Sequence, residues 1–320
     1  KLTMNPIQPF LDQFGVFILD GGLATQLEAL GADLADDLWS ARLLIDDPAL
    51  IRRVHAAYLW AGADCLISAT YQATIPGFMS RGLTEAEAED LIRYSVQLAL
   101  EERDAFWISQ NAEWQNVHLR PLVAASVGPY AAFRADGSEY TGAYDLDEKG
   151  LVEFHRRRWQ ILAHGEADLL ACETIPNFAE ARALVALLAE TLQRFAWFSF
   201  SCRDGKQIYD GTPIAECAAF LDQFERIAAI GVNCTAPRSI SSLIEEIRAV
   251  TDLPIIVYPN SGEIYDVEER HWVGESAPAE FGSLSREWRK MGAACIGGCC
   301  RTTPAHIRQI RDRFPARPRR

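Results

Sequence analysis

The chain has 320 residues, of which 49% are hydrophobic and 23% charged, a composition typical of a folded globular protein that excludes disorder and collagen-like repeats. Its 31 Lys and Arg against 44 Asp and Glu leave a net charge of -13. This is the wrong sign for binding along nucleic-acid phosphates, so we expect no nucleic-acid partner. Because no apolar run approaches the roughly 18 residues that span a bilayer, and residues 1–13 lack the pattern of a secretory signal, we expect no membrane partner and a cytoplasmic location.

Eight short runs rich in Val, Ile and Phe recur along the chain, each apolar throughout and polar at its carboxyl end. Continuous apolarity without alternation is typical of strands that are covered on both faces, which indicates a parallel sheet with helices outside it. In chain order the runs are Val16–Gly22, Cys65–Thr70, Leu122–Gly128, Leu169–Thr174, Ala196–Cys202, Ala228–Cys234, Pro254–Asn260 and Ala294–Cys300.

The segments between these runs carry the start and stop signals of helices. Asp47 followed by Pro48 is typical of a helix cap and first turn, and Thr84 with Glu87 forms a capping box. The last helix is predicted to begin at Thr303-Pro304 in the same way, while small-residue turns at 61–64 and 291–294 indicate helix-to-strand joints.

Eight strand-then-helix units are the number that closes a barrel, so we predict an α/β fold, a single (β/α)8 TIM barrel domain over residues 1–320. An open doubly wound sheet is disfavoured, because the turn Asp20-Gly21-Gly22 after the first strand is not the glycine-rich phosphate fingerprint of that fold. Two long connections, Pro129–Lys149 and Ser261–Pro278, leave the carboxyl ends of strands and are expected to be functional loops.

Three of the eight cysteines fall where a barrel carries its active site. Cys234 ends the sixth strand, and Cys299 and Cys300 follow the eighth, only one strand away. Adjacent residues of a strand face opposite sides, so these two thiols must lie just past the strand end, where Gly297-Gly298 gives a flexible backbone. Three thiolates select zinc and leave a fourth position open for a thiol or water substrate, which predicts a zinc site at the carboxyl-terminal rim.

Other interpretations of these cysteines remain open at this point. A vicinal pair could be a redox pair. A purely structural zinc site would need a fourth protein ligand, for which Asp20 and His271 are the candidates. The remaining cysteines are expected to be small packed side chains rather than a disulfide framework.

The two cysteine motifs, GVNC ending at Cys234 and GGCC ending at Cys300, resemble the zinc motifs of the homocysteine S-methyltransferase family. The resemblance covers nearly the whole chain and includes LDGG (Leu19–Gly22), YQAT (Tyr71–Thr74), SVGPY (Ser126–Tyr130), DGSEY (Asp136–Tyr140), CETIPN (Cys172–Asn177) and YPNSGE (Tyr258–Glu263). Within the family, the loop DGSEYTGAY, the short carboxyl terminus and Thr174, where betaine-dependent enzymes have tyrosine, make the chain more similar to the S-methylmethionine-dependent enzymes.

The resemblance implies methionine biosynthesis by zinc-dependent transfer of a methyl group from S-methylmethionine to the thiolate of homocysteine, with S-adenosylmethionine as a second donor. A free thiol with a pKa near ~8.5 is mostly protonated at neutral pH, and coordination to zinc removes that proton. The implied zinc ligands are Cys234, Cys299 and Cys300. The implied substrate contacts are Asp20 and Glu173 for the homocysteine ammonium, Thr70 and Ser126 for its carboxylate, Asn233 beside the site, and aromatic rings for the sulfonium among Tyr71, Tyr130, Tyr140, Tyr258 and Trp272.

Two alternatives to this function are kept. One is the same chemistry with another substrate: betaine as the donor, or selenocysteine or selenohomocysteine as the acceptor. The other is a zinc-stapled barrel that binds without turnover. We expect no corrin cofactor, and the sequence leaves the oligomeric state open.

Overall fold

The computed structural model describes residues 4–34, 38–191, 193–262, 264–266, 271–273 and 277–315. Eight parallel strands stand at its centre, and each falls within or beside one of the apolar runs: β1 (Phe17–Ile18), β2 (Cys65–Ile67), β3 (Leu122–Val127), β4 (Leu169–Ile175), β5 (Ala196–Phe200), β6 (Ile227–Asn233), β7 (Ile255–Tyr258) and β10 (Ala293–Ile296). Their order is β1-β10-β7-β6-β5-β4-β3-β2, and a parallel bridge between Leu19 and Cys65 brings the two end strands together. The predicted barrel is therefore confirmed.

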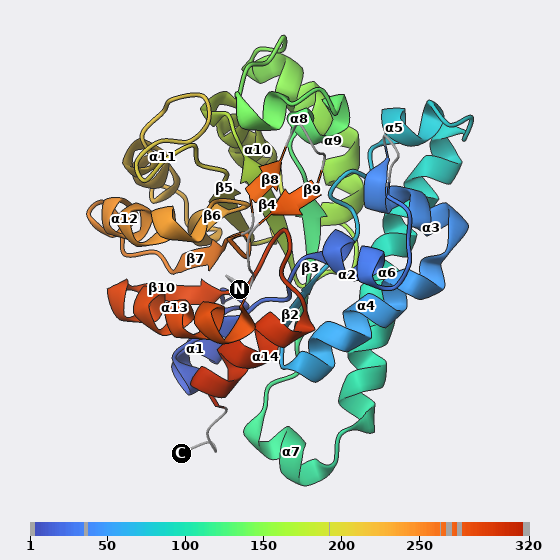
Figure 1. Ribbon diagram of the computed structural model, residues 1–320. Helices are drawn as coiled ribbons and strands as arrows, with labels where there is room; N and C mark the ends of the chain where they lie inside the picture. The colour runs from blue at the N-terminus through green and yellow to red at the C-terminus, as the bar shows by residue number, and fades with distance from the viewer. Residues whose placement is uncertain are drawn as a thin grey trace.

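Helices surround the strands on the outside, as the continuous apolarity of the strands requires (Figure 1). Long helices connect successive strands, and short ones lie in the loops. The helices are α1 (Gln8–Phe14), α2 (Leu23–Ala29), η1 (Trp39–Arg42), α3 (Leu43–Asp46), α4 (Pro48–Ala61), α5 (Ile75–Met79), α6 (Glu85–Ser109), α7 (Ala112–Val117), α8 (Tyr130–Arg134), η2 (Ser138–Tyr140), α9 (Glu148–Ala163), α10 (Phe178–Glu190), α11 (Ile214–Leu221), α12 (Pro237–Arg248), α13 (Pro278–Met291) and α14 (Pro304–Arg313).

The predicted helix signals are the ones that the structure uses. The Asp47 side chain accepts the Leu50 N–H at the start of α4, and Thr84 with Glu87 forms the capping box of α6. Thr303 caps α14. The turns at 61–64 and 291–294 contain glycines with φ of 103° and 120°, a left-handed conformation that ends α4 and α13.

The interior of the barrel is apolar toward the amino ends of the strands and has a polar layer toward their carboxyl ends. Trp197, Ile256 and Cys295 fill the apolar part, and Phe10 of α1 packs beneath them. Because strand side chains alternate, the next inward positions toward the carboxyl ends are also directed into the barrel. These positions carry Ser126, Glu173, Ser199, Asn233 and Tyr258, which are joined by hydrogen bonds. The polar layer forms the floor of the carboxyl-terminal mouth.

Both predicted functional loops leave this mouth and contain local structure. The loop after β3 contains α8 and η2, and the loop after β7 contains an antiparallel hairpin, β8 (Ile264–Asp266) and β9 (His271–Val273). The side chains of His271 and Trp272, and Glu263 of the YPNSGE motif, lie outside what the structure describes. Among the described residues, every helix is too short or too polar to cross a membrane.

Candidate functional site

A cavity of about 660 Å³ opens at the carboxyl-terminal mouth of the barrel. It is lined by all three cysteines of the predicted zinc site and by the two predicted ammonium-binding carboxylates, Asp20 and Glu173. This volume lies within the range of small-molecule sites, about 300–1,000 Å³. The structure therefore brings the predicted site residues from β1, β4, β6 and β10 to one cavity.

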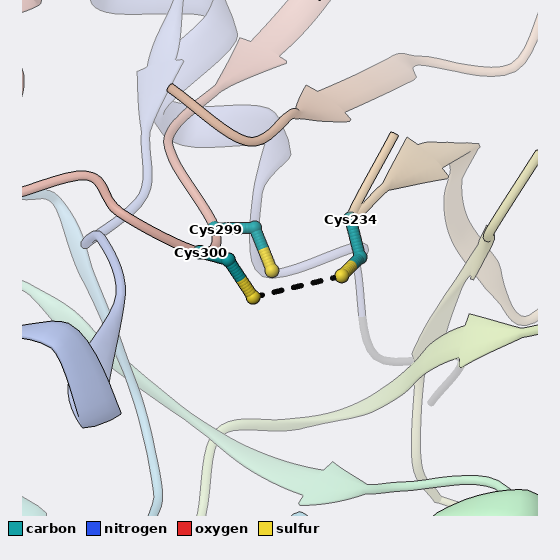
Figure 2. Close-up of side chains that lie close together, drawn as sticks. All are labelled: Cys234, Cys299 and Cys300. Carbon is teal, nitrogen blue, oxygen red and sulfur yellow. Dashed lines mark hydrogen bonds between the residues drawn. The ribbon is translucent and has the colours of Figure 1, made fainter. Parts of the chain in front are cut away.

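The three thiols converge from two loops (Figure 2). Cys234 follows β6, and Cys299 and Cys300 follow β10, past the strand end as expected. The sulfur atoms of Cys234 and Cys300 are 3.7 Å apart, and all three sulfurs lie within 4.8 Å of one another. Ligands at a Zn–S distance of about 2.3 Å in a tetrahedron are separated by about 3.8 Å. The donor set and its spacing thus fit a thiophilic metal such as zinc.

Close packing and one backbone hydrogen bond fix the loop that carries Cys299 and Cys300. A side chain at Gly297 would meet the Leu19 Cβ at 2.5 Å, and one at Gly298 would meet the Thr302 Oγ1 at 2.3 Å. Neither glycine has a positive φ. The glycines are thus needed for space, and not for the flexible backbone that the sequence suggested. The Cys299 N–H donates to the Pro259 carbonyl oxygen at 2.8 Å, which ties the loop to the end of β7.

The thiols also influence one another electrostatically. The pKa of Cys300 lies well below its ordinary value, because the Cys234 and Cys299 thiols donate hydrogen bonds to its thiolate. A metal binds the deprotonated form of cysteine. The same coupling raises the pKa of Cys234 and Cys299, so within the cluster it favours the thiolate form at Cys300.

Asn233, fully buried at the end of β6, connects the cysteines with β4. Its Nδ2 is 3.9 Å from the Cys299 Sγ and donates to the Thr174 Oγ1 at 2.7 Å, and its Oδ1 accepts the Thr174 N–H at 2.7 Å. Thr174 has a φ of 60°, a costly conformation for a β-branched residue. The pairing register of β4 with β5 shifts between Cys172 and Ile175 at this point. The Asn233 side chain thus hydrogen-bonds both the irregular part of β4 at Thr174 and the Cys299 thiol.

Glu173 and Asp20 are buried carboxylates that both line the cavity. Glu173 accepts the Ser126 hydroxyl at 2.5 Å and the Tyr258 hydroxyl at 3.1 Å, and burial raises its pKa to about 7. Asp20 accepts the Ile67 N–H at 2.8 Å, and burial, with the nearby charge of Glu173, raises its pKa well above the ordinary value. A cation bound beside them would favour their charged forms, so the pair suits a positively charged group of a substrate.

Thr70 and Ser126 lie behind the cavity wall rather than on its surface. Both are fully buried, and the Thr70 hydroxyl donates to the Ser126 carbonyl oxygen at 2.7 Å. The Ser68 hydroxyl lies 2.7 Å from that of Thr70, and Ser68 is the one that lines the cavity. Thr70, which follows β2, thus points toward β3 and away from the cavity. The apolar pattern of the strands does not reveal this direction.

Of the predicted aromatic residues, Tyr71, Tyr140 and Tyr258 line the cavity. Tyr130 instead packs edge-on against Tyr144, with ring centroids 5.3 Å apart, in a cluster outside the cavity.

Glu139 and Tyr209 are among the wall residues that were not predicted from the sequence. Glu139 accepts the Tyr71 hydroxyl at 2.9 Å, and the Tyr209 ring lies 5.8 Å from that of Tyr140. The position of Glu139 in the DGSEY motif was a signal for it, whereas no sequence pattern marks Tyr209.

A profile of the homocysteine S-methyltransferase family matches residues 17–314. The chain belongs to this family. It is 52% identical over 307 residues to the homocysteine S-methyltransferase YbgG of Bacillus subtilis, covering 96% of this chain and 97% of that one. It is 50% identical to homocysteine S-methyltransferase 1 of Zea mays, covering 92% of this chain and 93% of that one. The resemblance found in the sequence is confirmed, and the chain is a methyltransferase.

A solved structure supports the same assignment. The metallated form of the homocysteine methyltransferase MmuM from Escherichia coli superimposes with a TM-score of 0.86 at 43% identity, covering 96% of this chain and 99% of that one. That relative was thus solved with metal bound. In the present methyltransferase, the cluster of Cys234, Cys299 and Cys300 is the group of described residues able to hold a metal ion.

Proposed function

We propose that this methyltransferase uses zinc, held by Cys234, Cys299 and Cys300, to transfer a methyl group from S-methylmethionine to homocysteine. The observation that carries the proposal is the three-thiol cluster on the wall of a cavity that also contains two buried carboxylates. Thiolate ligands favour zinc over magnesium or calcium. When bound, the zinc ion keeps the sulfur of homocysteine deprotonated at neutral pH.

Asp20 and Glu173 hold the ammonium group of homocysteine. Both carboxylates are largely withdrawn from water, so an arriving cation is held strongly by their charge. Thr70 and Ser126, predicted to contact the carboxylate of homocysteine, support this wall from behind: Ser126 orients Glu173, and Thr70 orients Ser68. Ser68 lines the cavity, but its proton goes to Thr70, because the Thr70 proton goes to the Ser126 carbonyl oxygen. Backbone amides at these strand ends therefore take the homocysteine carboxylate.

Another part of the cavity lining, which we call the donor wall, suits a sulfonium donor. Tyr71, Tyr140 and Tyr209 present aromatic rings, and the Glu139 carboxylate lies among them. A cation is attracted to an aromatic face and to a carboxylate. The charges of Cys234 and Cys300 contribute to raising the pKa of Tyr140, which indicates that this wall is close to the thiols. A sulfonium bound here would therefore lie near the thiols that hold the metal.

The transfer is a direct displacement between two sulfur atoms. A lone pair on the homocysteine sulfur forms a bond to the methyl carbon while the bond from that carbon to the sulfonium sulfur breaks. The thiol proton has already gone to solvent. Both products are methionine, so the positive charge of the donor and the negative charge of the thiolate disappear together. The protein contributes orientation, which is the principal requirement of such a step.

The test is methionine formation from homocysteine and S-methylmethionine by zinc-reconstituted protein. We expect the wild type to turn over and Cys299→Ala to lose more than about a hundredfold in rate, since a ligand matters more than the groups that orient it. Cys217→Ala is the matched control, because Cys217 is a fully buried thiol on α11, outside the cavity. It should retain activity.

Two outcomes would change the proposal. If the zinc-bound wild type makes no methionine from S-methylmethionine but does so from betaine or S-adenosylmethionine, the donor is wrong. If it turns over none of these donors with homocysteine or its selenium analogues, the barrel is a zinc-stapled binding protein.

A further inference from the structure

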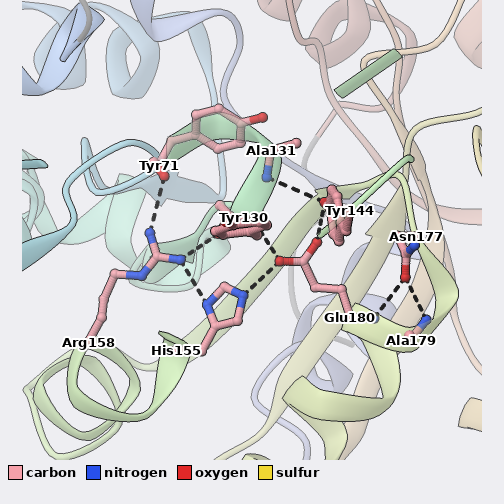
Figure 3. Close-up of polar contacts among 10 residues, drawn as sticks. Tyr71, Tyr130, Ala131, Tyr144, His155, Arg158, Asn177, Ala179 and Glu180 are labelled. Carbon is pink, nitrogen blue, oxygen red and sulfur yellow. Dashed lines mark hydrogen bonds and ion pairs between the residues drawn. The ribbon is translucent and has the colours of Figure 1, made fainter. Parts of the chain in front are cut away.

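A group of buried polar residues lies outside the cavity, between α9, α10 and the loops that follow β2 and β3 (Figure 3). It consists of Arg158 and His155 on α9 and Glu180 on α10. His155 and Glu180 are fully buried, and Arg158 is 3% exposed. Burial of an arginine and a glutamate is costly unless both are hydrogen-bonded and their charges balance. The hydrogen-bond partners of these three residues therefore show which parts of the chain the group holds together.

The hydrogen bonds determine the proton positions in this group. An Arg158 nitrogen lies 3.0 Å from the His155 Nδ1, and a guanidinium can only donate, so Nδ1 accepts. Burial lowers the pKa of His155, which favours the neutral ring with its proton on Nε2. That N–H then donates to the Glu180 Oε1 at 2.7 Å. His155 thus connects a cation to an anion as a neutral link.

At the cation end, Arg158 joins two loops of the cavity. Its guanidinium donates to the Gly128 carbonyl oxygen at 2.5 Å and to the Tyr71 carbonyl oxygen at 3.4 Å. These backbones touch because residue 128 has no side chain: a Cβ there would lie 2.2 Å from the Tyr71 oxygen. Arg158 therefore fixes the backbone of Tyr71, whose side chain lines the donor wall.

At the anion end, Glu180 holds the start of the loop after β3. Its Oε1 also accepts the Tyr130 N–H at 2.5 Å, and its Oε2 accepts the Tyr144 hydroxyl at 2.6 Å. Tyr130 and Tyr144 lie on either side of Glu139, which bonds the Tyr71 hydroxyl. Hydrogen bonds thus run from the Tyr71 backbone through Arg158, neutral His155 and Glu180 to Tyr130 and Tyr144. The backbone between those two tyrosines carries Glu139, whose bond to the Tyr71 hydroxyl completes the connection.

We propose that Arg158, His155 and Glu180 are positioning residues that set the donor wall of the cavity by fixing Tyr71 and the segment 130–144 together. They do not touch the substrates. They keep the Tyr71–Glu139 pair in the geometry that binds the methyl donor, so the inference rests on the proposed function for the identity of that donor.

The test compares Arg158→Lys with the wild type. A lysine keeps the charge but cannot donate to two carbonyl oxygens and an imidazole in one plane. We expect the KM for the methyl donor to rise about tenfold and the KM for homocysteine to change less. The reason is that the lost hydrogen bonds order the donor wall alone. Hydrogen exchange of segment 128–144 should become faster even without substrates.

Arg194→Lys is the matched control. Arg194 also donates to backbone carbonyl oxygens, those of Ala163, Gly165 and Ala167, but these lie in the connection between α9 and β4, which joins the barrel at the amino ends of its strands. It should leave the donor KM and the exchange of segment 128–144 unchanged. Tyr144→Phe, which removes one hydroxyl, is a second variant in case Arg158→Lys does not fold, and it should change both quantities in the same direction.

The proposal is overturned if the folded variants exchange segment 128–144 at the wild-type rate, or if the two KM values rise equally. The exchange measurement needs no donor. Failure of S-methylmethionine as a substrate of the wild type would therefore be a separate result, and the KM comparison would then use the donor that the wild type accepts.

Discussion

Glu173 shows how a barrel interior changes the chemistry of one side chain. It stands at the top of β4 among hydroxyl donors, and burial raises its pKa to about 7 from an ordinary 4.5. A carboxyl whose pKa is raised in the folded state keeps its proton at pH values at which the unfolded chain has already lost it. Its contribution to stability is therefore present below pH 4.5 and is lost as the pH rises through about 7. Such a group is costly to keep charged unless a cation arrives.

The first prediction concerns that cation. If Glu173 pairs with a substrate ammonium, binding requires its charged form, so affinity should increase with pH. A pKa of about 7 gives a gain of about tenfold between pH 6 and pH 8. Calorimetric titration with L-methionine measures this, because a thioether, unlike homocysteine, has no thiol that titrates in the same range.

Glu173→Gln is the control for this prediction. It keeps the size of the side chain and removes the titration, so the pH dependence should become shallower, with Asp20 responsible for any slope that remains. An equal slope in both proteins would contradict an ammonium contact at Glu173.

At the scale of elements, the distance between β6 and β7 determines where Cys234 lies. Gly231 of β6 pairs with Ile256 of β7, and a Cβ at Gly231 would lie 1.7 Å from the Ile256 carbonyl oxygen. Backbone cannot move aside as a flexible side chain can. Any side chain at this position must separate the two strands.

The second prediction follows from this contact. Gly231→Ala should lower the free energy of unfolding by about 1–3 kcal/mol, the usual cost of overpacking, and should weaken metal binding because Cys234 moves with β6. Denaturant titration and metal competition measure the two effects. Gly150→Ala is the matched control, since the atoms nearest to a Cβ there belong to the Leu146 and Asp147 side chains, at 3.1 Å or more. Wild-type stability and metal affinity in Gly231→Ala would refute the argument.

For the whole molecule, the three thiols join parts of the chain that are far apart in sequence. Cys234 follows β6 and Cys300 follows β10, and the strands of the barrel bring their sulfurs to 3.7 Å. A ligand that binds only the folded state stabilises it. A metal at this site would therefore act on the stability of the whole barrel as well as on catalysis.

The third prediction is that a chelator lowers the melting temperature of the metal-loaded protein. The loss corresponds to about 2.7 kcal/mol when free metal had been present at 100 times its Kd. Thermal melts with and without chelator measure it. Cys234→Ala should melt at the same temperature in both conditions, and an unchanged wild-type melt would argue against tight binding.

Much of the architecture was predictable because its signals are local. The apolar runs, the cap at Asp47 and the capping box at Thr84 depend on neighbours within one strand or one turn, and the structure uses each of them. The cysteine site was predictable for a related reason, since strand ends of a parallel barrel share one rim. The cytoplasmic location stays a prediction.

The unpredicted features arise between elements. Thr174 takes its left-handed conformation because Asn233, 59 residues away, holds both its N–H and its hydroxyl. Tyr209 reaches the cavity from a loop without a motif, and Ser68 rather than Thr70 lines the wall.

The sequence by itself determined the strand and helix order, the barrel and the three thiols, because apolar periodicity, caps and strand ends act over short separations. Tertiary structure alone decided which hydroxyls and rings line the cavity, the raised pKa of Glu173 and the buried link from Arg158 to Glu180. These depend on burial and on distances of a few ångströms between segments far apart in the chain, which exist only once the barrel has closed.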